Sequence, residues 1–132
     1  MLLANPRQLA PRVDTRADGG YIVAGERFMP DLAFMSKARQ PHPSNEAYNP
    51  LAPDLAVEVL WPSDDESNVR LKLADYLSAG TTVWIVNPDT KNVEIHTPNK
   101  PSSKLTENDT LDGSDVLPGY TMPVSDIFAD EE

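Results

Sequence analysis

The stretch PDLAVEVL, residues 53–60, predicts a buried strand that carries one acidic residue in its middle. Its apolar side chains form the short continuous run that is typical of a strand covered on both faces: Leu55, Ala56, Val57, Val59 and Leu60. Glu58 interrupts this run. A buried carboxylate is unfavourable unless it is paired, protonated or bound to a metal ion. Glu58 is therefore the first candidate for a functional residue.

Length and composition are those of one globular domain, which we expect to span residues 1–132. Within it we expect an irregular segment over residues 1–20 and a core over residues 21–128. With 39% hydrophobic residues the chain can fold around a core, and no apolar stretch is long enough to span a bilayer. It has no cysteine, which excludes disulfides and thiolate metal sites and favours the cytoplasm.

The net charge of −10 argues against nucleic-acid binding, because lysine and arginine are needed to neutralise phosphates. The charge is unevenly distributed, however. Residues 1–40 have a balance of +2, whereas the remaining 92 residues have a balance of −12. A polyanion would therefore meet the N-terminal third of the chain first.

The segments around residues 53–60 predict the other elements of the fold. Residues 21–35 read as two short strands joined at Gly25-Glu26, with Pro30 inside the second strand. A helix is expected to begin at a capping box of Ser63 and Glu66 and to end before Gly80. Its apolar stripe comprises Val69, Leu73, Tyr76 and Leu77.

The second half of the chain predicts further strands after this helix. TTVWIVNP, residues 81–88, is another continuous apolar run and hence a central strand, and residues 92–96 alternate as a half-exposed strand. Short strand pieces follow near residues 105 and 110–111, and a tail packs on the core through Leu117, Tyr120 and Phe128. This order predicts an α/β fold, a mixed β-sheet with one main crossover helix.

Two consecutive predicted strands each carry an acidic residue, Asp31 and Glu58. If the strands pair, the two carboxylates lie close together and raise each other's pKa unless a cation lies between them. A hard divalent ion, most simply Mg²⁺ with Mn²⁺ as a substitute, would remove this conflict, with the carbonyl of Val59 as a third ligand. Alternatively, each acid points to water or pairs with a cation such as Arg27 or Lys72.

Lys72 is the candidate basic residue of this site. On the predicted helix it flanks the inward stripe, four residues before Tyr76. It either extends to solvent or reaches over the strand end toward Glu58, where it would orient a water molecule or balance charge on a phosphate. His42, in a proline-rich loop, and His96, on a polar strand face, are expected to be solvated surface residues.

Four blocks of the sequence together resemble the Uma-two family of restriction-endonuclease domains, within the PD-(D/E)XK nuclease superfamily. They are RFMPDLAF (27–34), PDLAVEVLWPSDD (53–65), KLADYLSAGTTVWIVNPDTKNVEIHTP (72–98) and LTENDTLDGSDVLPGYTMPVSDIF (105–128). The resemblance covers roughly residues 20–128. It implies a restriction-endonuclease-like α/β core around a Mg²⁺ site.

The resemblance also implies roles for individual residues. Asp31 matches the acid of the PD element and Glu58 the (D/E) position, whereas Asp54 is not expected to be a ligand. Leu60 stands where the superfamily motif has lysine, and in this family the lysine is on the following helix, at Lys72. Family members usually begin with an extra helical region. Its absence here predicts an uncovered apolar sheet face, which a homodimer would bury.

The sequence therefore predicts a Mg²⁺-dependent endonuclease that hydrolyses phosphodiester bonds of DNA. Asp31, Glu58 and Lys72 are its predicted catalytic residues, and Asp31, Glu58 and Val59 its predicted metal ligands. The alternative is a catalytically inactive, truncated nuclease-like module that acts in assembly or partner binding. A third interpretation is a binding domain in which the two acids only form ion pairs.

Overall fold

A mixed β-sheet lies at the centre of the computed structural model, which describes residues 20–60 and 66–128. Its five strands run in the order β3-β5-β6-β7-β8. Their bounds are β3 (Leu32–Phe34), β5 (Leu55–Val59), β6 (Thr82–Asn87), β7 (Asn92–His96) and β8 (Ser103–Leu105). Strands β5 and β6 are parallel, and the other neighbours are antiparallel. Helix α1 (Glu66–Ser78) connects the two parallel strands, which confirms the mixed sheet with a crossover helix.

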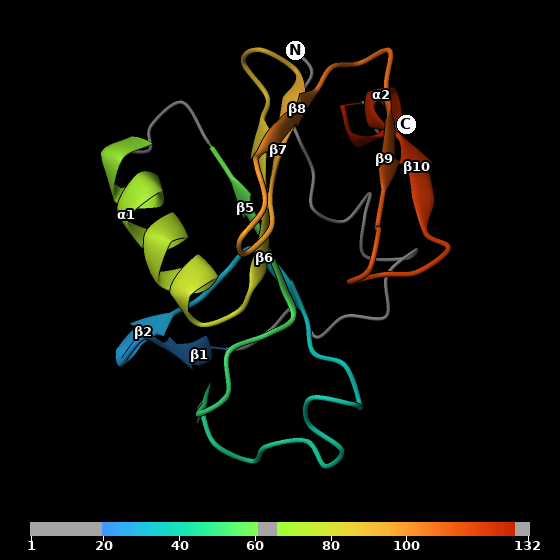
Figure 1. The fold of residues 1–132 in the computed structure, drawn as a ribbon. Coiled ribbons are helices and arrows are strands. Elements are labelled where there is room, and N and C mark those ends of the chain that lie inside the picture. The colour runs from blue at the N-terminus through green and yellow to red at the C-terminus, as the bar shows by residue number, and fades with distance from the viewer. Residues whose placement is uncertain (1–19, 61–65, 129–132) are drawn as a thin grey trace.

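The remaining elements form two smaller groups. Strands β1 (Gly20–Val23), β2 (Glu26–Phe28) and β4 (Tyr48–Asn49) form a sheet in the order β2-β1-β4. Strands β9 (Thr110–Asp112) and β10 (Thr121–Pro123) form an antiparallel pair that is followed by α2 (Val124–Ile127). Figure 1 shows α1 on one side of the central sheet and the β9, β10 and α2 group on the other side.

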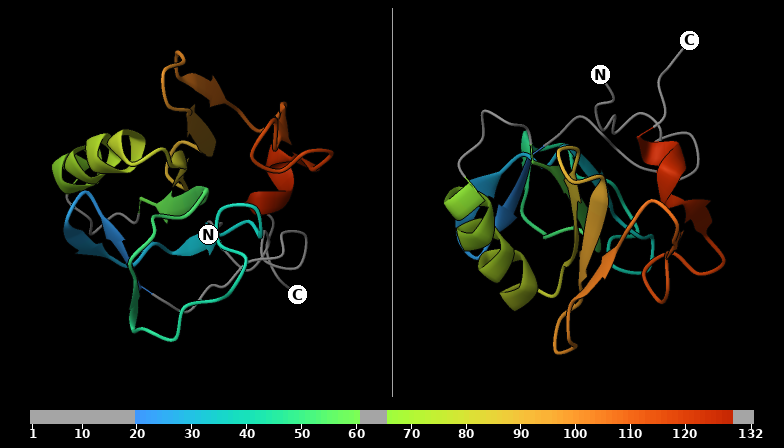
Figure 2. Two further views of the ribbon diagram at one scale, coloured as in Figure 1. Left: turned by 60° about the horizontal axis from the view of Figure 1, so that its bottom comes forward. Right: turned by 90° about the horizontal axis from the view of Figure 1, so that it is seen from above.

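Both faces of the central strands are therefore covered, as their continuous apolar sequences predicted. On one face, buried side chains of the sheet pack with Tyr21, Phe28 and Tyr76 from β1, β2 and α1. On the other face they pack with Leu111, Met122 and further residues of the C-terminal group, including Phe128. The view from above in Figure 2 shows these layers side by side.

The expected uncovered apolar face is absent from the described part of the chain. All side chains of β5 are buried. The exposed large apolar side chains of the described residues, Met29, Leu51 and Leu71, all lie outside the five-stranded sheet. The prediction of such a face is thus wrong for these residues, and the homodimer stays a prediction without that support. None of the described helices is long and apolar enough to cross a membrane.

The N-terminal hairpin differs from the prediction in two details. Its turn is Ala24-Gly25, one residue earlier than expected, with positive φ angles of 50° and 82°. These angles are typical of a type I′ turn, which matches the twist of short hairpins. In addition, the segment that was expected to form one second strand forms two strands, β2 and β3, which belong to different sheets. Pro30 lies at the break, where its lack of an N–H excludes it from a ladder.

Helix α1 is tied to strand β7 by a cluster of charged side chains. Arg70 donates two hydrogen bonds to the Glu94 carboxylate, at 2.6 and 2.8 Å. The Nε2 atom of His96 lies 2.8 Å from Oε1 of the same carboxylate. His96 is 13% exposed, so its prediction as a solvated surface residue is wrong, whereas His42 is exposed as expected. The Ser63 end of the predicted capping box and most of the irregular segment over residues 1–20 lie outside the described residues.

Glu94→Gln should lower the free energy of unfolding at pH 7 by roughly 1–2 kcal/mol, since Arg70 is partly exposed and its pairing is partly screened. The hydrogen bonds from Arg70 outweigh burial and hold the pKa of Glu94 at about 2, below its ordinary 4.5. A lowered pKa in the folded state stabilises the protein above pH 4.5, and this contribution is lost as the pH falls toward 2. In urea unfolding, the difference between the natural chain and the variant should therefore narrow below pH 4.5.

Glu107→Gln is the matched control, because Glu107 is exposed in the turn between β8 and β9. It should leave the unfolding free energy nearly unchanged at every pH. A difference between the natural chain and Glu94→Gln that stays constant as the solution is acidified would contradict the assigned role of Glu94.

Candidate functional site

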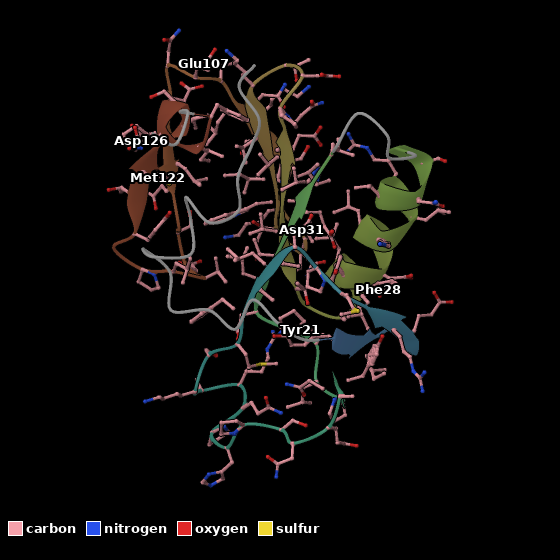
Figure 3. The ribbon with its side chains drawn as sticks, turned by 180° about the vertical axis from the view of Figure 1, so that it is seen from behind. Tyr21, Phe28, Asp31, Glu107, Met122 and Asp126 are labelled. Atoms are coloured by element: carbon pink, nitrogen blue, oxygen red, sulfur yellow. The ribbon has the colours of Figure 1, made fainter. Side chains whose placement is uncertain are left out.

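The pairing of β3 with β5 brings Asp31 and Glu58 together. Leu32 is paired with Val57 in this antiparallel ladder, so the next pair in the same register is Asp31 with Glu58. Directly opposite residues of an antiparallel pair carry their side chains on the same face. Asp31 itself precedes β3, and its carboxylate Oδ2 accepts a hydrogen bond from the Val59 N–H at 2.8 Å. Figure 3 shows Asp31 where β3 meets β5.

Glu58 is buried within β5, with 8% of the residue exposed. Its Oε2 atom accepts a hydrogen bond of 2.8 Å from the hydroxyl of Tyr76, which comes from α1. This bond gives the buried carboxylate a donor and so lowers the cost of burying it. The helix that follows β5 thus supplies a partner for the acidic residue in β5.

The negative charges of both carboxylates affect the pKa of the Tyr76 hydroxyl. Burial, followed by the negative charge of Glu58 and the hydrogen bond to it, raises the pKa of the Tyr76 hydroxyl far above its ordinary value. The charge of Asp31 raises this pKa further. The phenol therefore stays protonated and acts as a hydrogen-bond donor, so it is excluded as a general base at neutral pH.

The backbone of Val59 contributes to the same edge of the site. The N–H of Leu60 donates to the carbonyl of Val86 at 2.8 Å, so the backbone groups of Val59 face the opposite side, toward Asp31. In an extended strand the N–H and C=O of one residue point to the same side. The Val59 carbonyl therefore faces the side on which Asp31 lies.

These oxygen atoms are a donor set that suits a hard divalent cation. Mg²⁺ is commonly bound by one or two carboxylates and completes its coordination with water and phosphate oxygens. Within residues 20–60 and 66–128 there is no group of three or more histidine and acidic side chains that could hold a metal ion. A cation here would therefore depend on Asp31, Glu58 and a backbone carbonyl, not on an all-side-chain cage.

Lys72 lies beside the site without an ion pair to it. Its Nζ atom is 5.8 Å from the ring centroid of Phe28, and that ring packs against Tyr76 with centroids 5.1 Å apart. Among the described residues no ion pair joins Lys72 to Asp31 or Glu58. Lys72 thus reaches the aromatic rim of the site, and Figure 3 shows Phe28 beside the lower end of α1.

The interpretation in which the two acids pair with Arg27 or Lys72 is wrong. Arg27 lies over the ring of Tyr48, 5.2 Å from its centroid, and Lys72 lies over Phe28. Asp54 makes contacts away from the site. Its carboxylate accepts a hydrogen bond from the Ser36 N–H at 2.6 Å and lies 3.4 Å from Nε of Arg39. This agrees with the expectation that Asp54 is not a ligand.

Sequence reasoning missed Tyr76 as part of the site. Its position on the inward stripe of the helix predicted a core residue, and it is fully buried. The available signal was its spacing, since it follows Lys72 by four residues and so lies on the same line of the helix. A hydroxyl on a fully buried stripe needs a hydrogen-bond acceptor, and the sequence places a buried carboxylate, Glu58, in the preceding strand.

A cavity of about 180 Å³ lies on the other face of the sheet. The residues that line it include Trp84, Ile95, Lys100, Asp112 and Asp115. Trp84 packs with the C-terminal group, on the face of the sheet opposite to Glu58. This cavity is therefore separate from the carboxylate pair.

Comparisons with known proteins agree with the observed fold. The chain is similar in structure to a putative nuclease belonging to DUF820 from Anabaena variabilis ATCC 29413, with a TM-score of 0.76 and 18% sequence identity. The match covers 93% of this chain and 73% of that chain. At this identity the likeness shows the fold, which is that of the nuclease-like α/β core predicted from the sequence.

A search of curated proteins gives no match. The model of the Uma2 (Uma-two) family, described as "Putative restriction endonuclease", matches residues 2–125. This match covers nearly the whole chain and includes each of the predicted site residues, Asp31, Glu58, Val59 and Lys72. The chain therefore belongs to the Uma2 family.

Proposed function

We propose that this chain is a Mg²⁺-dependent endonuclease that hydrolyses phosphodiester bonds of DNA. The observation that carries the proposal is the position of the Asp31 carboxylate, 2.8 Å from the Val59 N–H and beside Glu58 in the β3–β5 register. Membership of a family described as restriction endonucleases supports the reaction class. Divalent metal ions are general in that class, and the oxygen donors at this site favour Mg²⁺ among them.

Asp31 and Glu58 would hold the ion, with the Val59 carbonyl as a further ligand. When bound, Mg²⁺ supplies positive charge for the phosphate oxygens and lowers the pKa of water. The protein contributes a rigid pair of carboxylates, because Asp31 is bonded to the β5 backbone and Glu58 to the Tyr76 hydroxyl. Rigid ligands need no rearrangement as the reaction proceeds, which favours the transition state.

Lys72 would act on the phosphate or on the attacking water. Its ammonium group is on a flexible stem and rests on the Phe28 ring, at the aromatic rim of the site. From there it can turn toward a phosphate held at the carboxylates, where its charge would offset the negative charge of the transition state. Lysine is not a ligand for Mg²⁺, so its contribution is separable from ion binding.

A second candidate function is a nuclease-like module without catalytic activity that acts in assembly or partner binding. The observation that favours it is the contact of Lys72 with Phe28 in place of the carboxylates. The net charge of −10 also weakens attraction to DNA. The homodimer and the cytoplasmic location belong to either function as predictions.

Mn²⁺ or Mg²⁺ should raise the melting temperature of the natural chain, because an ion that binds only the folded state stabilises it by mass action. At an ion concentration a hundred times the dissociation constant, the expected rise is about 5 °C or more. Asp31→Asn and Glu58→Gln should each abolish this rise. The measurement is thermal unfolding with and without the ion.

Asp54→Asn is the matched control, since Asp54 is also an acid of this segment but pairs with Arg39. It should change the melting temperature of the apo protein and keep the rise that the ion causes. A rise that persists in both Asp31→Asn and Glu58→Gln would place the ion elsewhere.

Lys72→Met should lower the rate of DNA cleavage by about a hundredfold or more, because it removes a charge at the reacting phosphate. Ion binding, measured by thermal unfolding, should be retained. Cleavage of labelled DNA is measured with Mg²⁺ and with Mn²⁺ at low salt, which favours binding to an acidic protein. Lys100→Met is the control, because Lys100 lies at the cavity on the other face of the sheet. This variant should cleave DNA as fast as the natural chain does.

Two outcomes of this experiment would overturn the proposal. If the natural chain cleaves no DNA with either ion, the module without activity takes its place. If Lys72→Met cleaves as fast as the natural chain, Lys72 is not part of the reaction.

A further inference from the structure

The hydroxyl of Tyr76 is held in a fixed place by its side-chain contacts. The residue is fully buried, and its ring packs against Phe28 at a tilt of 56°. Its hydroxyl donates to Oε2 of Glu58 at 2.8 Å. A closely packed aromatic ring has little rotational freedom, so the position of the Tyr76 hydroxyl oxygen relative to Glu58 is fixed.

The backbone of Tyr76 is fixed as well. Helix α1 ends in a Schellman motif in which the Gly80 N–H bonds the Leu77 carbonyl at 3.1 Å and the Thr81 N–H bonds the Tyr76 carbonyl at 2.9 Å. Gly80 has the positive φ angle, 85°, that this motif requires. The Thr81 hydroxyl then donates to the Pro53 carbonyl at 2.7 Å, just before β5 begins. The end of α1 that carries Tyr76 is therefore anchored to the strand that carries Glu58.

The site places two negative charges near this hydroxyl. Asp31 lies opposite Glu58 in the β3–β5 register, so the two negative charges repel each other. Both charges also raise the pKa of the Tyr76 hydroxyl. Without the hydrogen bond from Tyr76, the Glu58 carboxylate would be freer to rotate away from Asp31. Tyr76 opposes this rotation, because turning away would break its hydrogen bond and leave a buried hydroxyl unsatisfied.

We propose that Tyr76 is a positioning residue, whose hydroxyl holds the Glu58 carboxylate in the orientation that binds a divalent cation. This inference rests on the proposed function, because it concerns the same carboxylates. It adds a residue that touches neither the ion nor the substrate and acts only through Glu58. Hydrogen-bond partners of ligating carboxylates fix their orientation, and their loss weakens metal binding.

Tyr76→Phe tests the proposal by keeping the ring and its contact with Phe28 while removing the hydroxyl. Mn²⁺ affinity is measured from the electron paramagnetic resonance signal of the free ion, which needs no enzymatic activity. We expect the affinity of Tyr76→Phe to fall by about tenfold to a hundredfold. Tyr120→Phe is the matched control, since the Tyr120 hydroxyl contacts Met122 and its ring packs on Trp84, on the opposite face of the sheet. Its affinity should equal that of the natural chain.

A second measurement uses the natural chain and so does not depend on the folding of a variant. In a protein with isotope-labelled tyrosine rings, Mg²⁺ should shift the resonance of the ring carbon that bears the Tyr76 hydroxyl. The corresponding carbon of Tyr120 should not shift. A Tyr76 resonance that does not respond at saturating Mg²⁺ would overturn the proposal even if Tyr76→Phe fails to fold.

The outcomes separate this inference from the proposed function. One outcome is that the natural chain binds Mn²⁺, Glu58→Gln no longer binds the ion, and Tyr76→Phe binds it with unchanged affinity. In that case Tyr76 has only a structural role, and only the inference about Tyr76 fails. If the natural chain binds no Mn²⁺ in millimolar excess, the metal site itself is wrong and both proposals fail together.

Discussion

The burial of the Glu58 carboxylate in a central strand is the constraint on which the site depends. A buried charge must find donors, and the donor shown here is the Tyr76 hydroxyl on the helix that follows the strand. This contact requires the C-terminal half of α1 to lie near enough to β5 for the Tyr76 hydroxyl to reach Glu58. Lys72, one turn earlier on the same line, is thereby brought to the rim of the site. Removing the Glu58 carboxylate would leave the buried Tyr76 hydroxyl without its acceptor, at a cost of about 1–3 kcal/mol.

The orientation of α1 over the sheet is fixed at two places. Arg70, early in the helix, holds Glu94 of β7, and Tyr76, near its end, holds Glu58 of β5. These two strands flank β6, so the helix is tied to both sides of the strand that it packs on. A helix with two charged or polar attachments cannot slide by one turn without breaking both. This fixed orientation places Lys72 over the Phe28 ring, at the aromatic rim of the site.

Much of this arrangement could be predicted from the sequence. Continuous apolar runs identified β5 and β6 as strands buried on both faces, and the helical spacing between them identified the crossover. It was likewise predictable that Asp31 and Glu58 lie on the same face of the sheet if their strands pair, because directly opposite residues of paired strands point to the same face. The sequence left open whether these two strands are neighbours, and the β3–β5 register shows that they are.

The parts that could not be predicted depend on contacts between distant segments. His96 alternates on its strand as a surface residue would, whereas its side chain is largely covered and lies against Glu94, which Arg70 of α1 also binds. Tyr76 has the spacing of a core residue, so periodicity gives its face but not its hydrogen-bond partner. Pro30 was placed within a strand, whereas the chain breaks there and passes from one sheet to another.

The proposal that Asp31 and Glu58 hold a divalent cation together is tested by the anomalous diffraction of a crystal soaked in Mn²⁺. A peak is expected in contact with both carboxylates and with the carbonyl of Val59. An empty site at saturating Mn²⁺, or a peak only at Asp112 and Asp115, which line the cavity on the opposite face of the sheet, would contradict the proposal.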